Sequence, residues 1–271
     1  EQLKQLNTGI ITSSLPGDYK NLLARDDAFV TSPYSFSGNA PSALSGRLSY
    51  FYNINGPSVT VDTACASGLT ALYMARLALL NGDCDAALVG TVTIFASSEF
   101  YQLAQKSQML SQSNQCAAFD EQADGFVPAE GVVVLVLTSY KIACELHLPV
   151  YGLIESLKLN HNGLSNGLMA PNNKQQRNLI ARCYQLHHLE QLALIEAHGT
   201  GTKLGDPIEL RGLEEAFTEH HTKTECYLGA SKMIIGHTLV SSSLASLIKI
   251  LLAYEQQIIP PNPLFKNANP L

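Results

Sequence analysis

The sequence predicts an α/β fold. Short runs of β-branched residues alternate with longer apolar stretches of helical length, and this alternation is typical of sheets with helices packed on both faces. Hydrophobic residues make up 46% of the 271 residues and charged residues 15%. That composition supplies enough apolar material for a large core and too little charge for a disordered chain. We therefore expect a globular protein built from helix-covered sheets.

Seven runs are expected to be strands and four to be helices. The expected strands are residues 9–13, 58–62, 86–93, 131–137, 150–159, 192–197 and 227–230. The expected helices are residues 64–80, 175–187, 207–219 and 240–256. The helix over 64–80 is apolar nearly all round and is followed by Asn81 and Gly82, so we expect it to be buried and to end there.

These elements form two comparable series along the chain. We expect a single domain over residues 1–271, with an N-terminal half over 1–149 and a C-terminal half over 150–271. The first strand begins almost at once, and residues 258–263 form an extended exit stiffened by proline. Neither end resembles a natural domain boundary, so the chain is expected to be part of something longer.

Charge and hydropathy argue against two classes of partner. Lys and Arg number 17 and Asp and Glu 23, for a net charge of -6, and no long basic run is present, so nucleic-acid binding is not expected. The longest unbroken apolar stretch, residues 132–137, is far shorter than the roughly 18 residues of a membrane span. The N-terminus does not resemble a leader peptide. We expect a soluble, cytoplasmic protein.

The cysteines point to neither disulfides nor a metal site. Six cysteines are scattered along the chain without a C-x-x-C pair. This pattern fits neither a disulfide framework nor a thiolate zinc site. Any functional cysteine is therefore expected to act without a second cysteine, and no set of metal ligands is predicted.

Cys65 is the candidate nucleophile. It falls where the strand over 58–62 runs into the apolar helix, and the amide groups at a helix N-terminus favour a thiolate by about 0.3–1 kcal/mol when exposed and up to about 2 when partly buried. The alternative is that Cys65 is a small apolar residue packed between strand and helix, which is the commoner situation for a buried cysteine. The small residues Ala64, Ala66, Ser67 and Gly68 favour the functional interpretation, because they leave room beside the sulfur.

Two histidines follow later strands. His198 lies in a Gly/Thr loop after the strand over 192–197, ahead of Asp206 and Pro207, which are expected to open the next helix. A histidine at the end of a strand is expected to face a cleft, although it could also only organise the turn. His237 lies in the loop after the strand over 227–230. A cysteine and two histidines at three such junctions suit covalent acyl transfer.

Lys232 and the remaining histidines complete the set of polar candidates. Lys232 has strongly apolar neighbours in the sequence, so a buried Lys232 must be paired, with Glu209 or Asp206 as candidates. Two adjacent histidine pairs, His187-His188 and His220-His221, are expected to be solvated because neighbouring helical residues point to different faces.

Three motifs resemble a known family. Asp62-Thr-Ala-Cys-Ala-Ser-Gly-Leu69, His198-Gly-Thr-Gly-Thr202 and Lys232 followed by Gly236-His237, in that order, are similar to the β-ketoacyl synthase (ketosynthase) domains of modular polyketide synthases. The resemblance also covers Gly125-Phe-Val-Pro-Ala-Glu-Gly131, Asn160-His-Asn-Gly163 and Gly167-Leu-Met-Ala-Pro-Asn172. It therefore spans nearly the whole chain.

The resemblance implies a fold and an assembly. The expected fold is thiolase-like, with two related α/β halves stacked as αβαβα layers, usually in a homodimer. In that family a first strand precedes the part resembled here, and a Gly-Phe-Gly-Gly-type loop with the final strands follows it. The resemblance thus implies a domain that is incomplete at both its N- and C-termini.

The resemblance also implies an acyltransferase activity in polyketide biosynthesis. Cys65 would accept an acyl chain from the phosphopantetheine of an acyl carrier protein. His198 and His237 would hydrogen-bond a malonyl thioester carbonyl during decarboxylation, and the carbanion would attack the acyl-Cys65 thioester. No bound cofactor is implied, and the partners would be the carrier protein and neighbouring polyketide synthase domains.

Supporting roles follow from the same family. Lys232 would order the site through a carboxylate, for which Glu209 is the matching residue. Thr200 and Thr202 would contact the pantetheine arm. All these roles require that the Cys65 sulfur and the rings of His198 and His237 lie in one cavity.

Two other functions stay open. One is a ketosynthase that transfers or docks acyl chains without elongating them, although both histidines are present. The other is a cysteine hydrolase acting on thioesters, which leaves the second histidine and Lys232 without a role.

Overall fold

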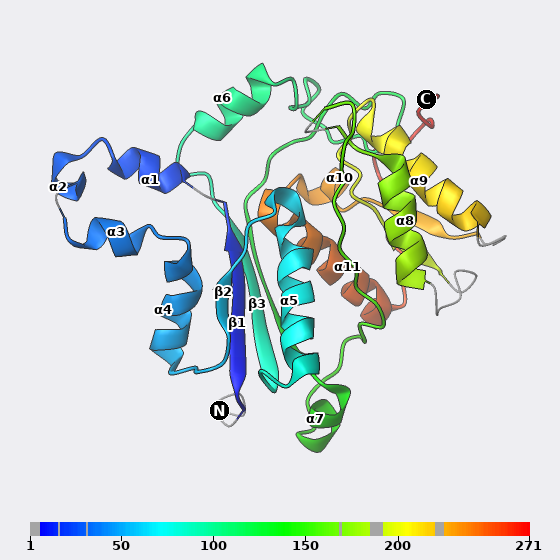
Figure 1. Cartoon of the computed structure of the whole chain (residues 1–271). Helices are drawn as coiled ribbons and strands as arrows, with labels where there is room; N and C mark the ends of the chain where they lie inside the picture. Colours follow the sequence, from blue (N-terminus) through cyan, green and yellow to red (C-terminus); the bar gives the residue numbers. More distant parts are fainter. Residues whose placement is uncertain (1–5, 16, 31, 168–169, 185–191, 220–224) are drawn as a thin grey trace. The chain divides into compact units, whose positions relative to one another are not determined.

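The computed structural model describes residues 6–15, 17–30, 32–167, 170–184, 192–219 and 225–271 (Figure 1). The chain divides into two compact units, each described here by itself. The first unit comprises Glu1–Leu103, Ala129–Leu153 and Thr238–Ala245, and the second comprises Ala104–Pro128, Ile154–His237 and Ser246–Leu271. The histidine pairs expected to be solvated, His187-His188 and His220-His221, lie outside the described residues.

The first unit is built on a four-stranded sheet in the order β2-β1-β3-β4. β1 is parallel to β2 and β3, and β4 is antiparallel to β3. The elements of the chain up to α5 are β1 (Thr8–Ser14), α1 (Asp18–Leu23), α2 (Asp27–Val30), α3 (Tyr34–Gly38), α4 (Ser42–Tyr52), β2 (Ser58–Thr60), η2 (Ala64–Ala66) and α5 (Ser67–Asn81). Further along lie β3 (Ala86–Thr93), α6 (Glu99–Lys106), β4 (Gly131–Thr138), α7 (Tyr140–Glu145) and η4 (Leu239–Ser241), of which α6 ends with residues of the second unit.

The burial of these strands follows their place in the sheet. Ile10 and Ile11 point to opposite faces of the central strand β1, and both are almost completely buried, as expected for a strand with neighbours on both sides. β4 lies at the edge of the sheet, and most of its residues alternate between half-buried and exposed. Its residues Val132, Val134 and Val136 stay 54–66% exposed, so the apolar run that predicted this strand is half-buried on one face and exposed on the other.

Helix α5 packs on β1 and β3 (Figure 1). Its buried positions include Ala71, Leu72 and Ala75, whereas Leu80 is 64% exposed. The expectation of a helix buried all round is therefore wrong, because α5 turns one face to the sheet and leaves part of the other accessible. Its end is as expected, since Gly82 adopts a left-handed C-cap with φ 77°.

Gly68 lets the N-terminal turn of α5 approach the segment after η4 closely. A Cβ at this position would stand 2.5 Å from Ser243 Oγ and 2.9 Å from Leu244 Cγ. We expect Gly68→Ala to lower the free energy of unfolding by about 1–3 kcal/mol, because inserted atoms strain a packed core. Chemical denaturation measures this change.

Gly46 in α4 provides the matched control. A Cβ there would meet nothing within 4 Å, and alanine in a helix is favoured over glycine by roughly 0.5–1 kcal/mol. Gly46→Ala is expected to be neutral or stabilising. Equal effects of the two substitutions would contradict the close approach at Gly68.

The second unit contains a two-stranded parallel sheet of β5 and β6. A small apolar cluster of Ala118, Phe119, Ala197, Ala230 and Met233 lies in this unit, with Leu228 and Leu264 packed against it. The elements in this part of the chain are α8 (Asn173–Tyr184), β5 (Leu194–Glu196), α9 (Gly205–Glu219), β6 (Tyr227–Gly229), α10 (Lys232–Ile235) and α11 (Ser242–Gln256), of which α11 begins with residues of the first unit. The apolar cluster underlies the loops that follow β5 and β6.

The C-terminal segment is fastened to this unit through Asp120. The Asp120 carboxylate is buried and accepts hydrogen bonds from the backbone N–H groups of Gln122, Lys266 and Asn267. Burial opposes its charge, but these bonds prevail and lower the pKa of Asp120. Asn269 N–H also donates to the Phe119 carbonyl, so the segment lies along the loop that contributes to the apolar cluster.

The strand expected over residues 150–159 is absent from the structure, which assigns no regular secondary structure there. Tyr151 and Leu153 are 62% and 66% exposed. The pattern suits a strand, but a strand also needs a neighbour to complete its backbone hydrogen bonds. Among the described residues this segment has no such ladder.

The other expected elements are confirmed in the described residues, with their ends shifted by a few positions. The helix expected over 175–187 is α8 as far as Tyr184, and residues 185–187 lie outside the described residues. Helices α1, α2, α3, α4, α6, α7 and α10 were not predicted, and the loop expected at Lys232 is the short helix α10. Most are only four to eight residues long, which is too short for a helical period to stand out.

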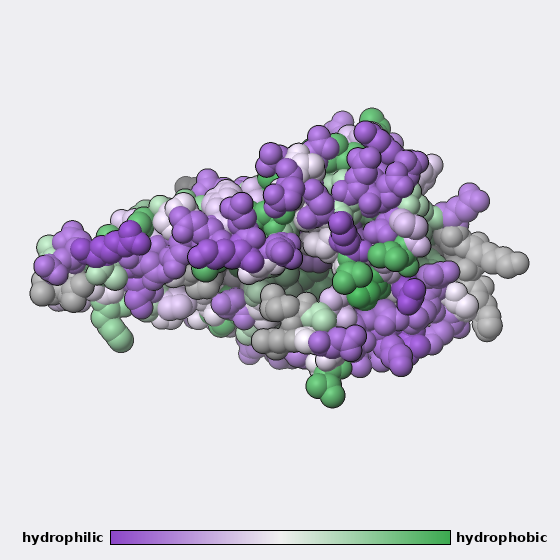
Figure 2. All heavy atoms as spheres, turned by 90° about the horizontal axis from the view of Figure 1, so that it is seen from above, coloured by the Kyte–Doolittle hydropathy of each residue, from purple (hydrophilic) through white to green (hydrophobic). Residues whose placement is uncertain are grey.

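None of the helices in the described ranges is long and apolar enough to cross a membrane. Figure 2 shows a mostly hydrophilic face, on which hydrophobic residues form small separate groups.

Candidate active site

Cys65 lies in the first unit, in the single 3-10 turn η2 directly before α5. The Asp62 carboxylate accepts the Ala64 N–H at 2.9 Å, and Ser67 Oγ accepts the Thr63 N–H at 2.9 Å. Ala64 has φ 51°, a left-handed conformation that is rare for a residue with a Cβ. These bonds fix a sharp turn that leaves Cys65 half-buried at the start of the helix.

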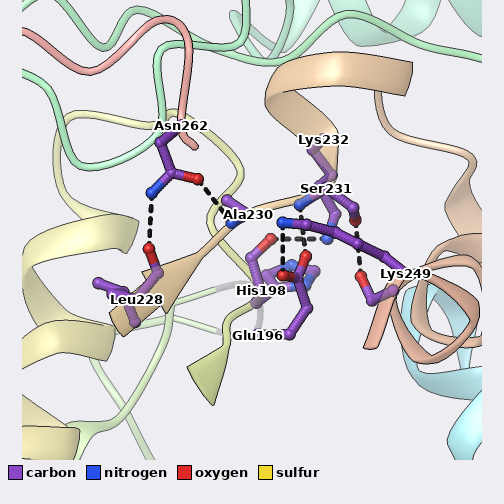
Figure 3. Close-up of polar contacts among 9 residues, drawn as sticks. Glu196, His198, Leu228, Ala230, Ser231, Lys232, Lys249 and Asn262 are labelled. Atoms are coloured by element: carbon purple, nitrogen blue, oxygen red, sulfur yellow. Dashed lines mark hydrogen bonds and ion pairs between the residues drawn. The ribbon is translucent and has the colours of Figure 1, made fainter. Parts of the chain in front are cut away.

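His198 lies in the second unit, two residues beyond β5, and polar groups hold its backbone from both sides. Its N–H and that of Gly199 donate to the two carboxylate oxygens of Glu209 at 2.7 and 2.9 Å. Its carbonyl accepts a hydrogen bond from Lys232 Nζ at 2.6 Å (Figure 3). Lys232 is only 3% exposed, so a buried cation and a carboxylate together fix the peptide that orients this ring.

The glycines after His198 are required by close packing. Gly199 has φ 42°, and a Cβ there would lie 2.8 Å from Ala230 Cβ. Gly201 has φ 69°, and a Cβ there would lie 2.8 Å from the Gly125 carbonyl oxygen. Side chains rarely adopt such backbone angles, so the Gly-Thr-Gly sequence lets the loop turn tightly over the residues beneath it.

The rings of His198 and His237 face each other edge to face. Their centroids are 5.6 Å apart with an interplanar angle of 86°. His237 N–H donates to the Val127 carbonyl at 2.7 Å, and the Phe126 ring contacts the His237 ring at 5.0 Å. Segments distant in sequence thus bring the two expected histidines together.

Both imidazoles are expected to be neutral at physiological pH. Desolvation, assisted by the positive charge of Lys232, lowers the pKa of His198 to about 3 and that of His237 to about 2. His237 is buried, whereas His198 is packed among protein groups but keeps part of its surface exposed to solvent. The buried Nδ1 of His237 has no hydrogen-bond partner among the described residues. Because buried polar atoms are nearly always paired, this nitrogen is suited to a ligand or an ordered water.

We expect both rings to remain neutral at pH 5. Between the unfolded histidine pKa of about 6.5 and the lowered folded values, the unfolded chain binds more protons, so the histidines make the free energy of unfolding decrease as the pH falls. Ring-carbon NMR titration measures the protonation directly, and a midpoint near 6.5 for either ring would contradict the lowered pKa values.

The histidine contribution to the free energy of unfolding must be measured against a reference variant. The reason is that two carboxylates change this free energy with pH in the opposite direction. Burial raises the pKa of both Glu209 and Asp206, so these groups favour folding as the pH falls through the region above their ordinary values. Comparison with the variant His198→Gln/His237→Gln isolates the contribution of the histidines.

Thr202, and not Asp206, provides the side-chain acceptor at the start of α9. Helix α9 begins at Gly205, whose N–H donates to Thr202 Oγ1 at 3.2 Å. The Asp206 carboxylate instead accepts the Phe119 N–H at 2.7 Å. The expectation that Asp206 and Pro207 open the helix as cap and first residue is wrong, because the Thr202 hydroxyl serves as the acceptor and Asp206 ties α9 to the loop at Phe119.

Sequence patterns did not predict the contacts of two further residues near the histidines, Glu196 and Cys116. Glu196 forms an ion pair of 2.7 Å with Lys249, and the Glu196 side chain is 1% exposed. Lys249 is a single charge within an apolar helical stretch, a signal that could have suggested a buried partner. Cys116 Sγ contacts the Gly199 carbonyl at 3.8 Å, and burial raises the pKa of this thiol to about 12.

The second unit therefore brings together His198, His237, Lys232 and Glu209, with Thr200 and Thr202 half-buried in the same loop. Cys65 belongs to the first unit. Its convergence with the two histidines, and the contact of both threonines with a pantetheine arm, stay predictions.

Comparisons with known proteins identify the family. The family model described as "Beta-ketoacyl synthase, N-terminal domain" matches residues 1–143, and the one described as "Beta-ketoacyl synthase, C-terminal domain" matches residues 151–266. A ketosynthase domain from oxazolomycin biosynthesis in Streptomyces albus JA3453 superposes with a TM-score of 0.93 at 33% identity, over 99% of this chain and 48% of that one. The ketosynthase from module 6 of the bacillaene synthase of Bacillus subtilis 168 has a TM-score of 0.88 at 35% identity, over 98% of this chain and 46% of that one.

Curated relatives are large multidomain synthases. Polyketide synthase PksL of Bacillus subtilis is 37% identical over 98% of this chain, and the compactin diketide synthase mlcB of Penicillium citrinum is 37% identical over 97%. This chain spans 6% and 10% of their lengths. The fold is thus the thiolase-like α/β fold of ketosynthases. The chain belongs to the β-ketoacyl synthase family, and it corresponds to a ketosynthase domain of polyketide synthases.

Proposed function

We propose that this chain contributes the catalytic residues of a decarboxylating ketosynthase that elongates polyketide chains. The observation that carries the proposal is the edge-to-face pair of imidazoles, His198 and His237, with ring centroids 5.6 Å apart. Their pKa values, lowered to about 3 and about 2, favour the neutral form of both rings. Neutral imidazoles can donate hydrogen bonds to a developing oxyanion without themselves titrating. Family membership supplies the reaction in which such donors are needed.

In the first half-reaction, Cys65 is the nucleophile. Its thiolate attacks the carbonyl carbon of an acyl thioester on the phosphopantetheine of an acyl carrier protein. The bond from that carbon to the pantetheine sulfur breaks, and the pantetheine leaves as a thiol after taking up a proton. The amide groups at the start of α5 favour the thiolate, and the Cys65 N–H is the proposed donor to the acyl oxygen.

In the second half-reaction, His198 and His237 stabilise the enolate. A malonyl-type thioester loses CO2, and the electron pair of the broken C–C bond becomes an enolate whose oxygen accepts hydrogen bonds from the two rings. The enolate carbon attacks the acyl-Cys65 carbonyl, the C–S bond breaks, and Cys65 leaves as a thiolate. The product is a β-ketoacyl chain two carbons longer on the carrier protein.

Other parts of the chain have supporting roles in this proposal. Lys232 and Glu209 hold the His198 backbone, and Thr200 and Thr202 contact the pantetheine arm. The acting form is a homodimer in the cytoplasm, connected to neighbouring polyketide synthase domains and served by an acyl carrier protein. Residues 1–149 and 150–271 are the two related halves of one domain. No resident cofactor is required, because the carrier delivers both substrates.

The decisive experiment uses the full synthase module that contains this chain. It is incubated with an acyl-primed substrate and a malonyl-loaded carrier protein, and both CO2 and the carrier-bound product are measured. The proposal predicts one CO2 per β-ketoacyl product. Acyl transfer without CO2 release would instead indicate a non-elongating domain, and release of free acid would indicate a thioester hydrolase.

A further inference from the structure

A buried ion pair lies beside the histidine loop without taking part in the proposed chemistry. Glu196 ends β5, and its carboxylate lies 2.7 Å from Lys249 Nζ of α11. The two side chains are 1% and 13% exposed. Removing two charges from water is unfavourable, so the pair needs compensating contacts.

The contacts of Glu196 lead directly to the residue before Lys232. The second Glu196 carboxylate oxygen accepts the N–H of Ser231 (Figure 3). Ser231 is also held through its hydroxyl, which lies 2.7 Å from that of Ser246 on α11. Lys232 follows and donates to the His198 carbonyl, so two hydrogen bonds separate Glu196 from the backbone of the proposed catalytic histidine.

Two neighbouring residues, Gly229 and Asn262, fit the backbone of β6 to this ion pair. A Cβ on Gly229 would collide with the Glu196 carboxylate and stand 3.0 Å from Lys249 Nζ, so only glycine leaves room for the ion pair on β6. The side chain of Asn262 binds the backbone on either side of Gly229: it donates to the Leu228 carbonyl at 2.6 Å and accepts the Ala230 N–H at 3.4 Å. The backbone from Leu228 to Ser231 is therefore fixed on both sides.

We propose that Glu196, neutralised by Lys249, is a positioning residue that fixes the Ser231-Lys232 backbone so that Lys232 holds His198 in its catalytic orientation. This role deepens the proposed function and rests on it. A misplacement of about 1 Å in a catalytic group can cost about 100-fold in rate. Cys65 acylation does not use His198 in this scheme, so the two half-reactions should respond differently.

The test compares two variants in the full synthase module. Glu196→Gln removes the charge but leaves Lys249 buried without its anion, which can destabilise the fold. The double variant Glu196→Leu/Lys249→Leu replaces the pair with apolar side chains, an exchange that is often neutral for stability. The double variant is expected to acylate Cys65 within about twofold of the wild-type rate and to decarboxylate the malonyl carrier about 10- to 100-fold more slowly.

The control removes an ion pair of the same unit that joins α8 to α9. Arg177 and Glu219 pair at 3.1 Å, and Arg177→Met/Glu219→Gln is expected to leave both half-reactions unchanged. A folded Glu196→Leu/Lys249→Leu variant that decarboxylates at the wild-type rate would overturn the positioning role.

A second readout separates this proposal from the proposed function. Lys232, His237, Glu209 and the Cys116 thiol are among the charged or titratable groups around the His198 ring and its loop. If Lys232 moves away, the ring-carbon NMR titration of His198 should shift to higher pH in the double variant and stay unchanged in the control. Absence of CO2 from the wild-type module would reject the ketosynthase reaction, while this titration would still decide whether Glu196 positions Lys232; an unshifted titration would reject that role.

Discussion

Replacing Cys65 with alanine is expected to abolish acyl loading. Thioester formation needs a sulfur nucleophile, and alanine offers none, so no covalent acyl adduct should form at this position. Incubation with an acyl thioester followed by intact-protein mass spectrometry measures the adduct. A Cys65→Ala protein that still gains a stoichiometric acyl group would show that the nucleophile is another residue.

Cys144 provides the matched control for this experiment. It is an exposed free cysteine on α7, so it is accessible to the same reagents. Cys144→Ser is expected to load acyl groups as the wild type does. Loss of loading in both variants would point to damage of the fold rather than to loss of the nucleophile.

Replacing either histidine with alanine is expected to slow decarboxylation by about 10²–10³-fold. This is the typical effect of removing one preorganised donor to an oxyanion, about 2.7–4 kcal/mol of transition-state stabilisation. His198→Ala and His237→Ala should affect CO2 release from a malonyl carrier far more than acylation of Cys65. Rates of the two half-reactions, measured separately, give the comparison.

His147 is a suitable control because it is exposed and lies on α7's C-terminal side. Its φ of 52° is a conformation that asparagine tolerates. His147→Asn should leave CO2 release unchanged. If His198→Ala and His237→Ala also decarboxylate normally, the two rings are not the oxyanion donors.

The sequence predicted much of this architecture because its signals are local. The strand over 86–93 and the helix over 207–219 have periodicities that need no knowledge of distant residues, and both are present as β3 and α9. Residues 150–159 show the limit of such reasoning. Their composition suits a strand, but strand formation depends on a neighbour that the local sequence cannot reveal.

The candidate site divides in the same way. Cys65 and His198 could be found because each follows a strand within a motif of small residues. The contacts of Glu196 with Lys249, and of Asp206 with the Phe119 backbone, join residues 53 and 87 positions apart. Such pairings arise from tertiary packing, and only the lone lysine in the apolar part of α11 hints at one of them.

The raised pKa of Cys116, about 12, has a consequence for chemical labelling. Electrophiles such as haloacetamides and acrylamides react with thiolates and hardly at all with protonated thiols. Cys116 should therefore be spared by covalent probes, although it contacts the backbone of the histidine loop. An electrophile attached to a pantetheine mimic could reach this neighbourhood without consuming that sulfur, so inhibitor stoichiometry would report on the intended target.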